Sequence, residues 1–166
     1  MERIKSFEVD HTKFGIGMYT SRIDGDITTY DVRMAKPNGG RYLEYPAIHT
    51  IEHLFATYAR NTEFSDNIIY VGPMGCRTGF YFLTRNLDPE KAIRIVRDSF
   101  EYIASYNGEI PGVSEKECGN YREHDLEGAK KSVLPFLEAT KNYSADMLDY
   151  SCLLYTSPSP RDGATS

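Results

Sequence analysis

The stretch "PAIHTIEHLFATYARN", residues 46–61, decides how the rest of the chain is arranged. Pro46 suits the first turn of a helix, because the N–H that proline lacks has no helical partner there. Apolar residues then recur at the three- and four-residue spacing of a helix with one buried face: Ile48, Ile51, Leu54, Phe55 and Tyr58. We therefore expect an amphipathic helix that packs on the core.

Strand patterns stand on both sides of this helix. Residues 14–38, "FGIGMYTSRIDGDITTYDVRMAKPN", indicate two strands joined at Asp24-Gly25, because Asp-Gly supplies the positive φ of a tight hairpin turn. Residues 67–73, "NIIYVGP", and 79–84, "GFYFLT", are typical of two further strands, with the short turn "PMGCRT" between them. Strands therefore pair off in the first half of the chain.

Helices dominate the second half. Asp88 is a typical N-cap and Pro89 a typical first residue of a helix that we expect to end at Gly108, with a buried face formed by Ile93, Val96, Phe100 and Ile103. Residues 124–143 predict a last helix, bent at Pro135. This order of elements indicates an α+β fold in which α-helices pack against an antiparallel β-sheet.

We assign residues 1–150 to a single domain. Residues 151–166, "SCLLYTSPSPRDGATS", have no periodicity and concentrate Ser, Pro, Thr and Gly, so we interpret them as a disordered or non-native tail.

Composition excludes several classes of function. The 166 residues are 40% hydrophobic and 26% charged, and a net charge of -5 spread along the chain does not suit a nucleic-acid surface. No apolar run approaches the roughly 20 residues that span a bilayer, and the N-terminal residues lack the apolar segment of a signal peptide. We therefore expect a cytoplasmic protein without membrane contact. Reduced thiols are expected there, so Cys76, Cys118 and Cys152 indicate metal ligation or catalysis rather than disulfides.

Two histidines on the central helix indicate a metal site. His49 and His53 are four residues apart, so both face the same side of the helix, and Glu52 lies near that side. The order H-x-x-E-H is that of inverted zincins, in which two ligands flank a general base. A helix that carries two surface histidines without a metal gives the same five-residue pattern.

A metal that acts as a Lewis acid needs about three protein ligands and one open position. An inverted zincin takes a downstream glutamate as its third ligand. Cys118 is the sharper candidate here, near the start of a short helical turn whose N–H groups favour a thiolate. Two histidines and a cysteine suit zinc or ferrous iron equally. Cys76, which follows Gly75 in a tight turn, is an acid/base thiol or a packed structural cysteine.

Four separated motifs resemble one enzyme family. "HTIEHLFA", "PMGCRTGFY", "ECGN" and "HDLEGAKK", in this order and spacing, resemble the S-ribosylhomocysteine lyase (LuxS) family, and "SFEVDHTK" and "YDVRMAKPN" resemble its N-terminal segments. The resemblance runs from about residue 4 to residue 150. It implies an α+β core and a metal-dependent carbon–sulfur lyase. The implied products are homocysteine and 4,5-dihydroxy-2,3-pentanedione, the precursor of autoinducer-2, which links the enzyme to quorum sensing and the activated methyl cycle.

The resemblance also implies roles for individual residues. His49, His53 and Cys118 match the metal ligands, Cys76 and Glu52 match the catalytic acid/base pair, and Ser6, His11 and Arg33 match substrate-contacting positions. In the family the last three face the active site of the partner subunit, so a homodimer with two interfacial sites is implied. Ferrous iron is the implied metal, with zinc or cobalt as substitutes.

The chain departs from the family pattern in two places. Tyr70 stands where many relatives carry an acidic residue, and "RMA" replaces an aromatic residue and a cysteine after Arg33. Both changes bear on a substrate hydroxyl contact and not on the metal ligands.

Two alternatives stay open. An inverted-zincin peptidase fits the histidine motif, but the chain is short and has no obvious second domain to grip a peptide. A non-catalytic metal-binding module needs a fourth ligand, for which His11 and His124 are the remaining histidines. We interpret His124 as a capping or packing residue at the start of the last helix.

Overall fold

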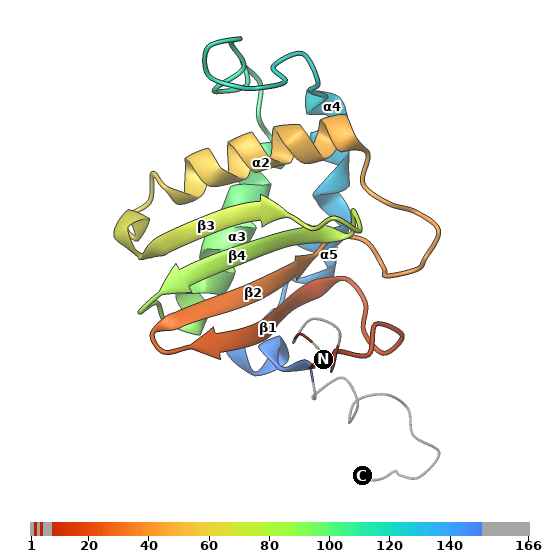
Figure 1. Ribbon diagram of the computed structural model, residues 1–166, viewed down its shortest axis with the longest axis vertical. Coiled ribbons are helices and arrows are strands. Elements are labelled where there is room, and N and C mark those ends of the chain that lie inside the picture. Colours follow the sequence, from red (N-terminus) through yellow and green to blue (C-terminus); the bar gives the residue numbers. More distant parts are fainter. Residues whose placement is uncertain (1, 3, 5–7, 151–166) are drawn as a thin grey trace, which may run out of the picture.

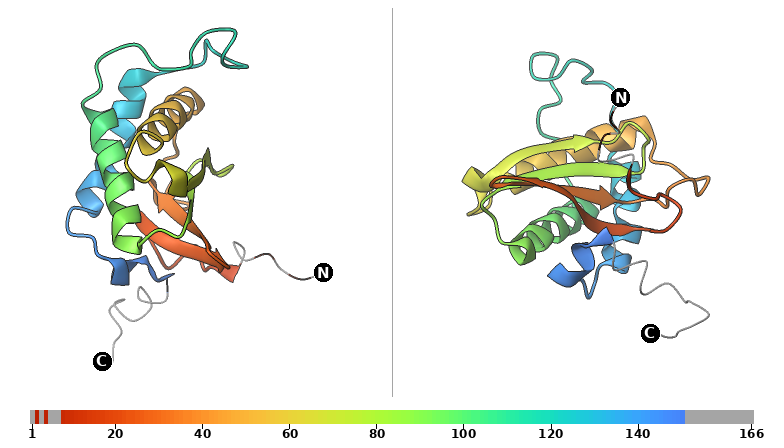
Figure 2. Two further views of the ribbon diagram at one scale, coloured as in Figure 1. Left: turned by 90° about the vertical axis from the view of Figure 1, so that its left-hand side faces the viewer. Right: turned by 60° about the horizontal axis from the view of Figure 1, so that its bottom comes forward.

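A four-stranded antiparallel sheet forms one layer of the protein, and helices cover one of its faces (Figures 1 and 2). This arrangement comes from a computed structural model, which describes residue 2, residue 4 and residues 8–150. The strand order is β1-β2-β4-β3. The predicted α+β fold is therefore confirmed. The predicted tail at 151–166, Cys152 and Ser6 lie outside the described residues.

Two hairpins build the sheet, as the sequence patterns predict. The first joins β1 (Gly17–Asp24) to β2 (Ile27–Arg33), and the second joins β3 (Ile68–Pro73) to β4 (Gly79–Arg85). The tight turn of the first hairpin differs by one residue from the prediction, because Asp24 pairs with Ile27 and the two loop residues are Gly25 and Asp26. Gly25 has a φ of 63°, a conformation that glycine adopts without strain. The strands β2 and β4 pair antiparallel in the middle of the sheet.

The helix that carries the histidine motif is α2 (Tyr45–Ala59), and it packs on α3 (Pro89–Ala104). A cluster of aromatic rings joins both helices to the sheet: Phe55 lies 5.6 Å from Phe82 and 5.3 Å from Phe100, measured between ring centroids. The N-cap prediction for α3 is confirmed, because the Asp88 side chain accepts a hydrogen bond from Glu90 N at 3.0 Å. The helix ends at Ala104, four residues before the expected Gly108.

The last helical region is two short helices and not one bent helix. Val133 is the C-cap of α4 (Leu126–Ser132) and also the N-cap of α5 (Leu134–Ala139). Pro135 occupies the first turn of α5, where its missing N–H is not needed. Short 3₁₀ turns at Ser65–Asn67 (η1) and Ala145–Leu148 (η2) complete the structure.

A long connection between α3 and α4 stands beyond α2 (Figure 1). Its residues, 105–125, form only turns and bends. In the described part of the chain, no helix combines the length and the apolar composition that crossing a membrane requires.

Candidate metal centre

His49 and His53 lie one turn apart on α2, with ring centroids 4.7 Å apart. Each ring donates its Nδ1–H to a backbone carbonyl of the connection 105–125: His49 to Glu123 O and His53 to Pro111 O, both at 2.8 Å. A carbonyl oxygen can only accept, so Nδ1 carries the proton in both rings and Nε2 keeps a free lone pair. This arrangement is the one that metal-ligating histidines show.

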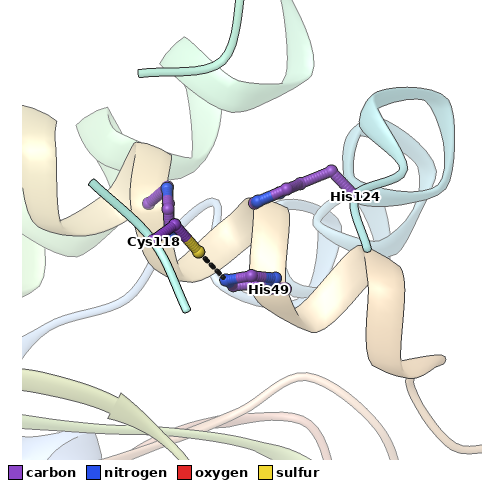
Figure 3. A group of neighbouring side chains, drawn as sticks. His49, Cys118 and His124 are labelled. Atoms are coloured by element: carbon purple, nitrogen blue, oxygen red, sulfur yellow. Dashed lines mark hydrogen bonds between the residues drawn. The ribbon is translucent and has the colours of Figure 1, made fainter. Parts of the chain in front are cut away.

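Cys118 lies against this histidine pair and belongs to the same cluster of possible metal ligands. Its Sγ lies 3.3 Å from His49 Nε2 (Figure 3). A sulfur at about 2.3 Å and a nitrogen at about 2.0 Å from one tetrahedral ion lie roughly 3.5 Å apart. The spacing of the two side chains therefore fits ligation of a shared ion, and the cluster fits a single metal.

The backbone around Cys118 differs in detail from the prediction. A single helical turn runs from Ser114, and Cys118 lies at its end, where its own N–H donates to Ser114 O at 3.0 Å. The N–H groups at the start of this turn therefore do not favour the thiolate as expected. The turn serves instead to place the sulfur against α2.

His124 is a fourth member of the cluster. The ligand atoms of His49, His53, Cys118 and His124 all lie within 4.8 Å of one another. The His124 ring stacks on the His49 ring at a centroid distance of 3.9 Å. The prediction that His124 caps a helix is wrong, because Asp125 is the N-cap of α4 and accepts from Gly128 N at 2.9 Å. The stacking of His124 on His49 agrees with the other role expected for His124, that of a packing residue.

Electrostatics keep the His124 ring neutral. Desolvation by burial, together with the neighbouring His49 and His53 rings, lowers the pKa of His124 from 6.5 to about 4. Its Nδ1 lies 3.0 Å from Thr50 Oγ1, a fully buried hydroxyl on α2. Its Nε2 is buried without a hydrogen-bond partner among the described residues.

Glu52 and His53 line the same pocket, which has a volume of about 330 Å³. Pro111 and Gly112 form part of its wall. Gly112 has a φ of 73°, and a Cβ at this position would lie 3.3 Å from His53 Nδ1. Glycine therefore lets the connection 105–125 pass close to the ligand ring. Glu52 therefore shares a pocket with one histidine of the cluster, His53.

Cys76 is exposed and lies in the turn between β3 and β4. Thr78 Oγ1 is 3.1 Å from its sulfur, and Arg33 Nη1 is 3.9 Å from it. The next residue, Arg77, is tied to the segment before α2, because Leu43 N donates to Arg77 O at 2.9 Å. No hydrogen bond joins Cys76 to the histidine–cysteine cluster in the part of the chain that the structure describes.

Arg33 contacts both His11 and the turn between β3 and β4 that carries Cys76. This buried side chain, 3% exposed, donates to Thr78 Oγ1 at 3.0 Å and lies 3.4 Å from His11 Nε2. His11 Nδ1 donates to Val9 O, so Nε2 is the acceptor that faces Arg33. Asp31 pairs with Arg33 at 3.4 Å, and burial raises the pKa of Asp31. All these contacts lie within one chain.

Tyr70, the position that departs from the family pattern, is 49% exposed on β3.

The sequence patterns do not single out Thr50 and Thr78, and of the two roles expected for His124 only packing agrees with the structure. Thr50 lies inside the histidine motif, and a polar residue at a buried helix position is a signal that it contacts another polar group. Thr78 and Cys76 are two residues apart in a turn, so their contact depends on the turn geometry. His124 is placed by the connection 105–125, whose path has no periodic signal.

Comparison with known proteins gives a consistent result. A family model described as S-Ribosylhomocysteinase (LuxS) matches residues 4–147. The protein named S-ribosylhomocysteine lyase from Borreliella afzelii is 43% identical over 156 residues, covering 90% of this chain and 99% of the relative. The proteins of the same name from Phocaeicola vulgatus and Clostridium acetobutylicum are 43% and 40% identical over 157 and 156 residues, each covering 90% of this chain and 98% and 99% of the relative.

Proposed function

The chain belongs to the S-ribosylhomocysteinase (LuxS) family, and from this membership we propose that it is a metal-dependent lyase that cleaves the thioether of S-ribosylhomocysteine. The observation that carries the proposal is the cluster of His49, His53 and Cys118, whose donor atoms converge within a chain matched by the family over residues 4–147. Neither alternative is favoured: the relatives are named as lyases and not as peptidases, and the match spans nearly the whole chain.

The reaction is an elimination. A thioether is a poor substrate for direct hydrolysis, but a sulfur that is β to a carbonyl leaves as a thiolate when the adjacent carbon loses a proton. The sugar carbonyl therefore has to migrate along the carbon chain before the carbon–sulfur bond breaks. Homocysteine and 4,5-dihydroxy-2,3-pentanedione together contain all the atoms of the substrate, so no water, oxidant or reductant is consumed.

The donor set fits a divalent transition metal, because two imidazoles and one thiolate suit iron, zinc and cobalt. Such an ion, when bound, is a Lewis acid that stabilises negative charge on the oxygens of the sugar. Ferrous iron is our proposal for the native ion. Its support is the resemblance to the LuxS family, since the donor set alone does not separate iron from zinc.

Cys76 and Glu52 are the proposed acid/base groups. Each carbonyl shift moves a proton between neighbouring carbons, which requires side chains that both accept and donate. Glu52 lines the same pocket as His53, one of the proposed metal ligands, and this neighbourhood supports the assignment of Glu52 as an acid/base group. Cys76 is exposed at the end of the sheet that lies next to the start of α2. We assign the early proton shifts to Cys76 and the later shift and the elimination to Glu52.

Ser6, His11 and Arg33 are the proposed substrate contacts, and the proposed assembly is a cytoplasmic homodimer with two interfacial sites. Within one chain, Arg33 lies 3.9 Å from the Cys76 sulfur and 3.4 Å from His11 Nε2, so the assignment of these residues to the partner's site rests on the family resemblance. Heterodimers of a His11→Ala subunit and a Cys76→Ala subunit test this assembly. If His11 serves the partner's site, each heterodimer regains one intact site and thiol release returns. Lasting inactivity would assign His11 to the Cys76 of its own chain.

The proposed reaction has a direct test. Protein purified without oxygen and loaded with Fe²⁺ should release homocysteine thiol and the dicarbonyl product in equal amounts from S-ribosylhomocysteine. The Cys76→Ala protein should bind the same amount of Fe²⁺ and release neither product. If the loaded wild-type dimer released no thiol, the lyase proposal would fail.

A further inference from the structure

We propose that His124 donates a hydrogen bond from Nε2 to the substrate oxygen that enters the centre of the cluster, and that it is not a fourth metal ligand. This inference rests on the proposed lyase function for the identity of that oxygen. The assignment of the proton to Nε2 rests on the structure of the chain alone.

His124 Nε2 is buried and has no hydrogen-bond partner among the described residues. His124 also belongs to the cluster in which one donor atom from each of His49, His53, Cys118 and His124 lies within 4.8 Å of the others. Figure 3 shows the His124 ring directed toward the same space as the Cys118 sulfur and the His49 ring. A buried polar atom without a partner in the chain calls for an explanation, and a catalytic role is one of the recurring ones.

Thr50 decides which nitrogen of His124 carries the proton. Thr50 Oγ1 accepts a hydrogen bond from Asp125 N at 2.9 Å, so one of its lone pairs is used. Its own hydroxyl proton also needs an acceptor, because the side chain is fully buried. His124 Nδ1, at 3.0 Å, is the acceptor within reach. Nδ1 therefore has no proton, and the neutral ring carries its proton on Nε2.

The two ligand histidines have the opposite arrangement. His49 and His53 face carbonyl oxygens through Nδ1, so each presents a lone pair at Nε2. His124 faces a hydroxyl donor through Nδ1, so it presents an N–H at Nε2. A ring nitrogen that holds a proton cannot bind a metal ion. The cluster would thus hold a metal ion through His49, His53 and Cys118, and His124 would contribute a hydrogen-bond donor beside it.

An N–H fixed at this place has a chemical use. Each proposed carbonyl shift builds negative charge on a sugar oxygen, and a preorganised donor stabilises that charge more than the neutral oxygen of the ground state. The stacking of His124 on His49 and its bond to Thr50 fix the direction of the N–H before the substrate arrives. The connection 105–125 therefore supplies a metal ligand, two carbonyls that orient the ligand rings, and this donor.

Nitrogen NMR tests the proton assignment without any turnover. In protein loaded with Zn²⁺ and labelled with ¹⁵N, we expect the His124 ring to show an unprotonated Nδ1 and a protonated Nε2. The His49 and His53 rings should show a protonated Nδ1. A metal-shifted His124 Nε2, or a proton on His124 Nδ1, would overturn the proposal.

Variants test the role of the donor. His124→Phe keeps a ring that can stack on His49 but removes the N–H, and Thr50→Val removes the hydroxyl that sets the tautomer. Both should bind one Co²⁺ per chain with the absorption spectrum of the wild type. Acetohydroxamate, a small oxygen ligand, should bind the Co²⁺ protein of His124→Phe about 10-fold more weakly. Thiol release should fall about 100-fold in kcat with a smaller change in KM, as when one oxyanion donor is lost.

Thr50→Ser retains the hydroxyl and should restore the wild-type values. Loss of Co²⁺ or a changed spectrum in His124→Phe would show that His124 is a ligand. Unchanged hydroxamate affinity in that variant would show that the ring only packs. If the wild-type enzyme itself released no thiol, the proposed function would fail, while the NMR and hydroxamate results would still decide the tautomer and the donor role.

Discussion

Cys118 Sγ lies 3.3 Å from His49 Nε2, although 69 residues separate the two side chains along the sequence. The contact fixes the connection 105–125 against α2, and the carbonyls of Pro111 and Glu123 in that connection orient the two ligand rings. A segment without helix or strand therefore determines whether α2 carries a metal site or only two histidines.

Gly112→Ala should weaken the metal site. The new Cβ would lie 3.3 Å from His53 Nδ1 in a backbone conformation with a φ of 73°, which alanine tolerates poorly. We expect the hydrogen bond from His53 to Pro111 O to distort and the metal affinity to fall about 10-fold, the order of effect of lost ligand-orienting contacts. Metal competition titration measures this change. Gly119→Ala is the matched control, because nothing lies within 4 Å of its added Cβ, and it should bind metal like the wild type.

Glu52→Gln should abolish most of the thiol release but leave the metal content of the protein unchanged. The amide keeps the size of the side chain but can neither accept nor return a proton, so thiol release should fall by about 10²- to 10⁴-fold. Metal content should stay at one ion per chain, because Glu52 is not among the clustered donor atoms. The exposed Glu63 gives a control in Glu63→Gln, with full activity expected. Near-normal turnover in Glu52→Gln would remove Glu52 from the mechanism.

Arg33 and Asp31 should prove coupled in stability. They are 3% and 2% exposed, so Arg33→Met leaves the Asp31 carboxylate buried without its cation. Breaking a buried pair from one side costs about 3–5 kcal/mol in the free energy of unfolding. Arg33→Met combined with Asp31→Asn should recover part of this loss, and urea unfolding of the single and double variants measures it. If the loss of unfolding free energy in the double variant equalled the sum of the losses in Arg33→Met and Asp31→Asn, the two residues would not be coupled.

Tyr143 should contribute to instability at alkaline pH. Its hydroxyl donates to Met18 O at 2.7 Å and accepts from Met18 N at 3.1 Å, and burial raises its pKa above the usual value of 10. The folded state favours the neutral phenol, so this stabilisation is complete below pH 10 and is lost as the pH rises above 10.

Tyr143→Phe removes both hydrogen bonds of this hydroxyl. At pH 8 the substitution should therefore lower the free energy of unfolding by about 1–2 kcal/mol. The difference from the wild type should stay constant from pH 8 to about pH 10 and shrink as the pH rises further. Urea unfolding across this range measures it. A difference that grows with pH would contradict the raised pKa of Tyr143.

Local signals in the sequence were sufficient for much of the fold. The spacing of Ile48, Ile51 and Leu54 predicts α2, and the side chain of Asp88 caps α3 as its position next to Pro89 indicates. Each of these features depends on residues within one or two turns of one another. The division of the last helical region at Val133 was less clear, because Pro135 allows either a bend or a new first turn.

The candidate site was predictable only where its residues share an element or a motif. His49, His53 and Glu52 follow from helical spacing. Cys118 was a candidate third ligand because of its thiol and its position in a short turn, and the family resemblance then matched it to a metal ligand. The role of His124 depends on Thr50, 74 residues away, and on the path of a connection without periodicity. Long-range contacts of this kind leave no pattern in a single sequence.

Metal titration with simultaneous measurement of thiol release tests the central claim most directly. Fe²⁺ is added in steps to the metal-free protein without oxygen, and homocysteine release from S-ribosylhomocysteine is recorded at each step. We predict that the rate rises linearly to one ion per chain and then stays constant, and that Cys118→Ala neither retains the ion nor releases thiol. Full thiol release by the metal-free wild type, or by Cys118→Ala without bound metal, would contradict the account.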